Sequence, residues 1–521
     1  MKNKKFIIIC ASVIFVMVAA VVAAVVIVIT KSFGTSEKYQ TIVVTSKEKN
    51  ASKTEDTEDD NNSSKTEVSS VLANSSKTTN ASSKNNTTSS KNNSSGSNTS
   101  SEQSTELSSA TIASNMNRIY AKMNSSAGIK ATDKEISASV YNVGNRYRIA
   151  NVINKAKSGK RIKVAFLGGS ITVGAGSNAT PESGVIKASP SGNAYDDWVC
   201  DWLAESFECL VTNINAGIGA TDSVYGTHRL YEDVLSSNPD LVILEYDCND
   251  SDGDKNKQGT YESIVRKCID NGTALIIFSF CKDNGGSSQA MHEPIATHYN
   301  IPMISYRDAF LDNAKFTYFT NDGIHPNATG HTLAGMLICK YIESVYKNLD
   351  SVEKEDITLP STTVNADAKK YDGAYVATLK DIYDNKVEGV RIKDLGSFSF
   401  DKTETKFVYK NFVGLTAGYS ENYKPLVIEV DKCKTAFLEM FRSSKLLGSE
   451  FSVKLNGSEL NSNTFTCMHG SDNSQTELTY MWATERLCYF DNGKSVTIEI
   501  TPKITSENST SYVKLFALLL S

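Results

Sequence analysis

Residues 319–331, FTNDGIHPNATGH, place an aspartate three positions before a histidine and a proline directly after that histidine. On such a loop the Asp322 carboxylate can accept a hydrogen bond from one imidazole nitrogen of His325, which leaves the other nitrogen free to take a proton. Pro326 restricts His325 to an extended backbone and suits the first turn of a following helix. The stretch therefore predicts a general base aimed by its own loop, and His331 is expected to have a structural role.

A serine that this base could activate follows the first predicted strand. The strand KVAFL, which begins at Lys163, runs into GGSITVG, where Gly168 and Gly169 allow a sharp exit and Ser170 stands at the predicted start of a helix. A serine at a helix N-terminus offers an exposed hydroxyl and a backbone N–H, so it could act as a nucleophile and as an anion donor. A glycine-rich turn with an ordinary capping serine is the alternative at this point.

Two later strand ends carry groups that could stabilise a developing negative charge. The small residues of NAGIGATDS, 215–223, let backbone N–H groups approach a ligand closely, although a simple tight turn would need them too. EYDCNDSD, 245–252, places Asn249 just past an apolar run. An asparagine amide can donate two hydrogen bonds without carrying a charge, which suits an oxyanion, and an Asx-turn is the alternative role. His228 in GTHRL is expected to pack behind the second of these loops.

Metal chemistry is not expected. A calcium site is conceivable in the acidic stretch after the third strand, but its spacing lacks the rest of an EF-hand loop; the aspartates concerned are Asp247, Asp250, Asp252 and Asp254. The ten cysteines include no C-x-x-C pair and no Cys/His cluster at zinc spacing. Cys200 and Cys209 could form a disulfide, with buried reduced thiols as the alternative. We therefore expect neither a metal nor an organic cofactor.

The elements that must position these residues are indicated by short apolar runs that alternate with amphipathic stretches. The runs are KVAFL, CLVTNIN, DLVILEY, TALIIFSF and IPMIS, and the stretches between them include AYDDWVCDWLAESF and TYESIVRKCIDNG. Nearly continuous apolar strands separated by helices indicate a parallel sheet covered on both faces. Functional sites in such α/β folds lie beyond the carboxyl ends of the strands, where the candidate residues occur.

Four blocks, GGS, GIGAT, CND and DGIH, follow one another at successive strand ends. In order and placement they resemble the SGNH hydrolase superfamily, also called the GDSL esterases, from about Gly144 to Lys347. The resemblance implies a three-layer α/β/α domain that hydrolyses esters through a serine nucleophile. It also implies site roles: Ser170 as nucleophile, His325 as general base and Asp322 as its orienting partner. The implied oxyanion hole combines the Ser170 backbone N–H, a backbone N–H of the second block and the Asn249 side chain.

The sequence departs from the superfamily pattern at two places. Gly-Gly-Ser stands where many members have Gly-Asp-Ser, a form that resembles the carbohydrate-acetyl-esterase-like branches. In the second block Gly219 is the expected backbone donor, while an ungapped comparison would place Ala220 there. A backbone donor tolerates either residue, so activity is expected in both cases.

The remainder of the chain changes character after about residue 350. Residues 370–521 alternate apolar and polar positions in short runs separated by turn signals such as NGS and DNG, which predicts an antiparallel, jelly-roll-like β-sandwich. Such a domain could bind carbohydrate, but the fold alone does not establish binding. Three aromatic residues are expected to have a core role, with stacking on a sugar as the alternative: Tyr480, Trp482 and Tyr489.

The N-terminal part predicts attachment to a membrane. Residues 6–30 are an uncharged apolar run long enough to cross a bilayer, and the preceding basic residues place the rest of the chain outside the cell. A cleavable signal peptide is the alternative. Residues 31–135 are rich in Ser, Asn, Thr and Lys and are expected to form a disordered linker. The expected order is a cytoplasmic N-terminus at 1–5, the anchor, the linker, the hydrolase domain at 136–350 and the β-sandwich at 351–521.

These expectations combine into one functional hypothesis. We expect a membrane-anchored extracellular serine esterase that removes acetyl groups from a carbohydrate or polysaccharide. A lipid or thioester acylhydrolase is the alternative enzyme, and a surface carbohydrate-binding protein without catalysis is the alternative of another class. The formal net charge of −5 gives no sign of nucleic-acid binding.

Overall fold

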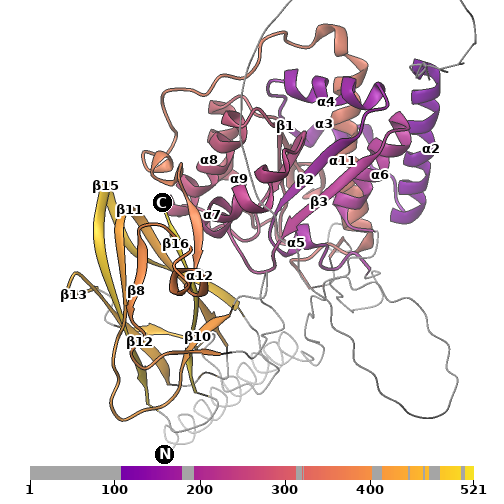
Figure 1. The fold of residues 1–521 in the computed structure, drawn as a ribbon. Coiled ribbons are helices and arrows are strands. Elements are labelled where there is room, and N and C mark those ends of the chain that lie inside the picture. Colours follow the sequence, from indigo (N-terminus) through magenta and orange to yellow (C-terminus); the bar gives the residue numbers. More distant parts are fainter. Residues whose placement is uncertain are drawn as a thin grey trace, which may run out of the picture. The chain divides into compact units, whose positions relative to one another are not determined.

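A six-stranded sheet built from strands between residues 140 and 305 positions the candidate residues (Figure 1). The structure is a computed structural model. It describes residues 107–178, 193–312, 319–320, 322–401, 413–443, 446, 448–460, 464–468, 481–505 and 511–521, without the side chains of 481–483. The predicted anchor and all but the last part of the predicted linker lie outside these residues. In the part of the chain that is described, no helix is long and apolar enough to span a membrane.

The strand order of this sheet is β1-β6-β5-β4-β2-β3, and the five strands from β2 to β6 are parallel. Only the short edge strand β1 is antiparallel to its neighbour. The chain leaves β2 for β3 on one side and then returns to β4 on the other, so the order reverses around the end of β2. The strands are β1 Val140–Asn142, β2 Ile162–Gly168, β3 Val211–Gly217, β4 Leu241–Glu245, β5 Ala274–Ser279 and β6 Met303–Ser305. The predicted parallel α/β sheet is confirmed.

Helices cover both faces of the sheet because alternate strand residues point to opposite sides. Phe166 and Ile243 belong to a core shared with α2, α4, α6 and α11, whereas Leu167 and Leu244 belong to a core shared with α7, α8 and α9. The longer helices are α2 Ser109–Ala127, α4 Tyr147–Lys157, α6 Tyr195–Phe207, α7 Ser223–Asp233, α8 Lys255–Asp270, α9 Gln289–His298 and α11 Ala328–Lys347. Shorter helices are α3 Asp133–Ala138, α5 Ser170–Val173 and α10 Tyr306–Phe310.

Helix α2 shows that the folded domain begins well before residue 136, where the sequence analysis placed its start. Its side chains Ile112, Ile119 and Met123 are fully buried in the core that also contains α6 and α11. Ser108 caps the helix by accepting a hydrogen bond from the backbone N–H of Thr111. The linker boundary at 135 was wrong because the polar composition of this stretch hid an apolar helical face.

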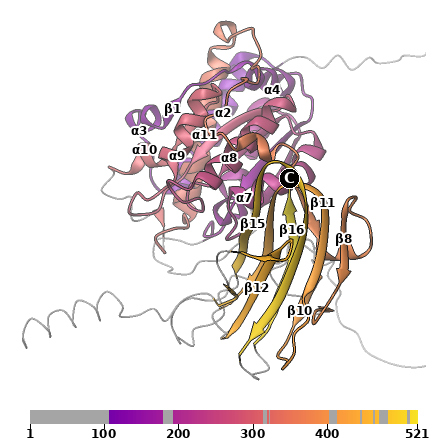
Figure 2. The ribbon, with the colours of Figure 1, turned by 90° about the vertical axis from the view of Figure 1, so that its left-hand side faces the viewer.

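The C-terminal domain is an antiparallel β-sheet with its own core (Figure 2). Its elements are β7 Tyr375–Thr378, α12 Leu379–Tyr383, β8 Val390–Asp394, β9 Ser399–Asp401, β10 Gly414–Ala417, β11 Leu426–Arg442, β12 Ser449–Leu455, β13 Ser458–Glu459, β14 Phe465–Thr466, β15 Met481–Ile504 and β16 Val513–Leu520. All pairings between these strands are antiparallel, as the alternating pattern predicted.

The long strands β11 and β15 join the described strands of this domain into one sheet. The first part of β11, at 427–430, pairs with β8, and its later part, at 436–440, pairs with β16, while β15 accompanies it along both parts. Register shifts between Val430 and Thr435 separate the two parts. Such shifts bend a strand, which lets one strand serve both ends of a curved sheet.

The segment between the two domains packs on the α/β domain. The carboxylate of Glu262 on α8 accepts hydrogen bonds from the backbone N–H groups of Val364 and Asn365, at 2.7 and 2.6 Å. The β-domain proper therefore begins at β7 rather than at residue 351. The nine cysteines in the described residues, Cys200 and Cys209 among them, are free thiols, so the alternative of reduced thiols holds for that pair.

Candidate active site

The hydroxyl of Ser170 lies at the end of β2, at the point where the strand order reverses. Strand β2 ends at Gly168, Gly169 is the N-cap of the short helix α5 and Ser170 is its first residue. The Oγ of Ser170 is 2.8 Å from the Nε2 of His325, an ordinary hydrogen-bond distance. The structure therefore brings the predicted nucleophile and the predicted base into contact.

The imidazole of His325 is oriented by Asp322 from the same loop. Its Nδ1 lies 2.6 Å from Oδ2 of Asp322, while Oδ1 of that carboxylate accepts the backbone N–H groups of Ile324 and His325 at 2.9 and 2.7 Å. Burial raises the pKa of Asp322, but its hydrogen bond with His325 and the neighbouring N–H groups outweigh burial and hold that pKa below its ordinary value. The carboxylate is thus an anion that keeps the proton on Nδ1 and leaves Nε2 to face the serine.

The loop that carries His325 rests on Gly176. Gly176 has φ +87°, and a Cβ at this position would lie 2.3 Å from the carbonyl oxygen of Pro326, so only a glycine permits this approach. Helix α11 follows, with Asn327 as its N-cap through a 3.0 Å hydrogen bond from the N–H of Gly330. Pro326 thus precedes the cap and does not occupy the first helical turn, where we expected it.

The second block lies directly beside the serine. The atom nearest to a Cβ built on Gly219 would be Cβ of Ser170, at 3.8 Å. The next residue, Ala220, has φ +60°, an uncommon conformation for a residue with a side chain. The proximity fits a backbone donor from this block, and the choice of Gly219 over Ala220 stays a prediction.

Asn249 lies close to Gly169, the residue before the serine. A Cβ on Gly169 would be 2.2 Å from Oδ1 of Asn249, so the Gly-Gly-Ser sequence makes room for this amide. Among the described residues Oδ1 of Asn249 accepts no hydrogen bond, although an Asx-turn would require it to do so. The side chain of Asn249 therefore does not form an Asx-turn, and its amide N–H groups could donate to an oxyanion.

Two other histidines have structural roles, as expected. The buried His331 lies with Nε2 3.0 Å from the carbonyl of Ala175 and accepts the backbone N–H of Tyr195 at Nδ1, 3.3 Å away. Burial lowers its pKa to about 4. His228 on α7 donates from Nδ1 to the carbonyl of Val224, and burial lowers its pKa to about 3. Both rings are thus neutral packing groups at neutral pH.

A cavity of about 620 Å³ opens on the side of the site that holds Asn249. It is lined by Ala220 and Asn249 but not by Ser170 or His325, so it adjoins the proposed oxyanion side of the serine. Both domains contribute charged and amide side chains to its wall: Asp222, Asp254, Asn256 and Lys257 from the α/β domain, and Glu439, Arg442, Glu485 and Arg486 from the β-domain. Such a lining suits a ligand with many hydroxyl groups.

Of the three aromatic residues considered for a core role or for stacking on a sugar, the structure describes the side chain of Tyr489. Tyr489 is in contact with Lys370, whose ammonium lies 3.7 Å from its ring centroid, so one face of the ring is covered. Tyr480 and the side chain of Trp482 lie outside the residues that the structure describes.

The acidic residues after β4 serve the fold locally. Asp254 caps α8 by accepting the N–H groups of Asn256 and Lys257, and Asp250 accepts the N–H of Ser223 at 2.9 Å. Across the described ranges no group of three or more His, Cys, Asp and Glu side chains is arranged to hold a metal ion. A residue that the sequence analysis missed, His292, lies between Asp247 and Asp250.

Comparisons with known proteins find similarity to one family and to solved structures. Residues 166–333 match the family model of the GDSL-like Lipase/Acylhydrolase family. A two-domain esterase active on acetylated mannans has a similar structure, with a TM-score of 0.60 and 25% identity over 74% of this chain and 98% of that one. The same esterase co-crystallised with mannopentaose gives a TM-score of 0.58 at the same identity and coverage. No curated protein is significantly similar in sequence.

Proposed function

Since residues 166–333 form a GDSL-like lipase/acylhydrolase (SGNH) domain and the chain is a carboxylic ester hydrolase, we propose that it removes acetyl groups from a carbohydrate. Ser170, His325 and Asp322 carry the reaction, with Asn249 and a backbone N–H of the second block as oxyanion donors. The observation that carries this proposal is the unbroken hydrogen-bonded chain from Asp322 through His325 to Ser170.

The geometry supports a two-step acyl transfer. In the first step Oγ of Ser170 attacks the acetyl carbonyl carbon while Nε2 of His325 takes the hydroxyl proton, and the negative charge develops on the carbonyl oxygen. When the tetrahedral intermediate collapses, the sugar oxygen leaves with that proton and the acetyl group stays on Ser170. Water, deprotonated by His325, then attacks the acetyl-enzyme and releases acetate, which regenerates the serine. Asp322 stays ionised throughout and stabilises the imidazolium.

Two observations favour a carbohydrate over a lipid or thioester substrate. The wall of the cavity beside Asn249 holds many charged and amide groups next to apolar ones such as Val224 and Phe437, and the charged and amide groups suit sugar hydroxyls better than an acyl chain. The similar two-domain esterase acts on acetylated mannans, and the match extends over both domains of this chain. The hydrogen-bonded serine and histidine argue against a carbohydrate-binding protein without catalysis.

We also propose that the hydrolase domain lies at the outer surface of a cell. This location rests on the apolar run at 6–30 and on Lys2, Lys4 and Lys5 before it. Fractionation of cells that produce the full chain tests it. Recovery in the detergent-extracted membrane fraction, with digestion of the hydrolase domain by protease added outside, is the expected result. Recovery in the cytosol would contradict it.

A substrate screen tests the catalytic proposal. Purified residues 107–521 are assayed with acetyl, butyryl and octanoyl p-nitrophenyl esters and with acetylated mannan and xylan, and Ser170→Ala serves as the matched control. We expect acetyl esters to be preferred and acetate to be released from at least one polysaccharide. A preference for octanoyl esters without acetate release would favour the lipid alternative.

A further inference from the structure

Asn249 sits at the tip of a tight turn that follows β4. The backbone N–H groups of Asn249 and Asp250 both donate to the carbonyl of Tyr246, at 3.0 and 2.8 Å. Asp247 enters this turn and Asp250 leaves it, so a carboxylate lies on each side of Asn249 in the chain. The position of the Asn249 amide therefore depends on the groups that hold these two carboxylates.

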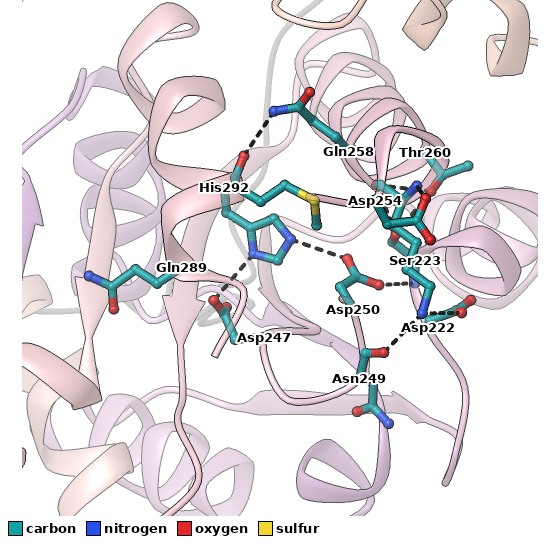
Figure 3. A network of polar contacts seen from close by, with 12 residues as sticks. Asp222, Ser223, Asp247, Asn249, Asp250, Asp254, Gln258, Thr260, Gln289 and His292 are labelled. Atoms are coloured by element: carbon teal, nitrogen blue, oxygen red, sulfur yellow. Dashed lines mark hydrogen bonds and ion pairs between the residues drawn. The ribbon is translucent and has the colours of Figure 1, made fainter. Parts of the chain in front are cut away.

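His292 of α9 lies between the two carboxylates (Figure 3). Its Nε2 is 3.1 Å from Oδ2 of Asp250, and its Nδ1 is 3.3 Å from Oδ1 of Asp247, an ion-pair distance. The ring is fully buried and stacks on Tyr261 of α8 with the ring centroids 3.6 Å apart. The imidazole is thus fixed from two directions while its two nitrogens face two different aspartates.

A neutral ring has one N–H to donate, which the contact with Asp250 can use, whereas the approach of Nδ1 to Asp247 is an ion-pair contact without a hydrogen bond and is favourable for a protonated imidazole. Burial lowers the pKa of His292, but Asp247 and Asp250 outweigh burial and raise this pKa to about 9. The other ionisable groups that face the cluster include Glu245 of β4, whose pKa burial raises to about 8, and Tyr261 of α8, whose pKa burial also raises. Tyr246 and the ion pair of Asp222 with Lys257 lie on the side of Asp250. At neutral pH the cluster therefore holds one imidazolium between two carboxylates.

The two carboxylates also connect this turn to neighbouring elements, Asp250 to the second block and Asp247 to β5. Oδ1 of Asp250 accepts the backbone N–H of Ser223 at 2.9 Å, and Ser223 begins α7 three residues after Ala220. Asp247 accepts the hydroxyl of Ser279, the last residue of β5, at 2.9 Å. His292 thus lies behind both elements that are proposed to supply the oxyanion hole.

We propose that His292 is a positioning residue for the oxyanion hole: by bridging Asp247 and Asp250 it fixes the turn that presents Asn249. The inference rests on the oxyanion role of Asn249 in the proposed function. His292 itself touches neither the serine nor the cavity wall, so its effect on the reaction passes through Asn249.

A double-mutant cycle between His292→Gln and Asn249→Ala tests this coupling. Glutamine keeps a polar side chain of similar length but cannot contact both carboxylates as an imidazolium does. With p-nitrophenyl acetate we expect His292→Gln alone to lower kcat by about 10- to 100-fold with KM changed by less than about threefold. In the Asn249→Ala background the same substitution should lower kcat by less than about threefold, since the donor that it positions is gone.

His228→Gln is the matched control, because His228 is also a buried helix histidine and is 2% exposed. Its effect on kcat should be within about twofold in both backgrounds. An equal loss of kcat for His292→Gln with and without Asn249 would overturn the proposal and assign His292 to stability alone. Unchanged kcat in folded His292→Gln would overturn it as well.

Asp250→Asn keeps the inference testable if His292→Gln fails to fold, because an asparagine oxygen can still accept the N–H of Ser223. It should also lower kcat, and the loss should again disappear in the Asn249→Ala background. The rate of inactivation by a p-nitrophenyl phosphonate gives a second readout that involves no sugar. Failure to deacetylate mannan or xylan would therefore count against the proposed substrate only. The double-mutant cycle with p-nitrophenyl acetate would still test the role of His292.

Discussion

The Nε2 of His325 lies 2.8 Å from the Oγ of Ser170, although 155 positions separate the two residues in the sequence. The serine follows the end of β2 and the histidine lies on the loop before α11. The contact therefore exists only when the sheet and that helix are assembled. Because a nucleophile and a base that share a hydrogen bond act as a unit, removal of either side chain should abolish most of the activity.

Ser170→Ala should lower kcat by at least about 10³-fold and abolish labelling by an organophosphonate. The hydroxyl is the atom that forms the acyl-enzyme, whereas an alanine leaves β2 and α5 undisturbed. Hydrolysis of p-nitrophenyl acetate and mass spectrometry of the labelled protein measure the two effects. Labelling that persists at another serine would show that the nucleophile lies elsewhere.

Asn249→Ala should lower kcat by about 10²- to 10³-fold with little change in KM, because its amide would stabilise charge that exists only in the transition state. Steady-state kinetics with p-nitrophenyl acetate separates the two constants. A variant that loses thermal stability but keeps kcat would mean that the amide serves the turn and not the oxyanion.

Asp322→Asn should be more damaging than Asp322→Ala. Oδ1 of residue 322 accepts two backbone N–H groups, so an asparagine would turn its NH₂ toward Nδ1 of His325 and force the wrong tautomer. We expect a loss in kcat of about 10³- to 10⁴-fold for Asp322→Asn. Alanine leaves the imidazole free to adopt either tautomer, so it should retain more activity. The opposite order of the two variants would contradict the orienting role.

Local signals explain how much of this architecture could be predicted. The strands β2 to β6 were predictable because each is a short apolar run between turn signals. Asp322 and His325 were predictable because three positions on one loop suffice to bring them together. Gly169 and Asn249 were both placed at strand ends, but their close packing depends on the parallel pairing of β2 with β4.

Features that depend on contacts between distant parts of the chain could not be predicted from the sequence. The apolar face of α2 is diluted by serine and asparagine, so only packing against α6 and α11 reveals it. His292 contacts Asp250 across 42 positions, and nothing in its neighbourhood HEP marks an ion pair. Strand β11 changes its partner from β8, which precedes it in the chain, to β16, which follows it. The alternation of apolar and polar residues does not indicate such a change of partner.

Chelation should leave the rate unchanged. The carboxylates of Asp250 and Asp254 already accept backbone N–H groups, and the proposed chemistry uses only groups of the chain. Dialysis against EDTA followed by assay with and without added Ca²⁺ measures the effect. An activity that EDTA removes and calcium restores would mean that residues 247–254 bind a metal after all.

Stability should fall as the pH drops from 7 to 5, in part because of His331. Burial lowers the pKa of this histidine to about 4 in the folded state, whereas the unfolded chain titrates near its ordinary value of about 6.5. Between these values the unfolded state binds a proton that the folded state does not. The free energy of unfolding should therefore decrease on acidification, by about 2 kcal/mol from His331 between pH 7 and 5.

His331→Gln separates this effect from the acid sensitivity of the rest of the chain. Urea unfolding at pH 7 and pH 5 should show a smaller difference between the two pH values for the variant than for the wild type. Activity at pH 7 should stay above about a tenth of the wild-type rate, because His331 contacts Ala175 and Tyr195 and not the serine. If the folded variant were as inactive as His325→Ala, His331 would have to act in the reaction itself, and the Asp322–His325 pair would be an incomplete account of the base.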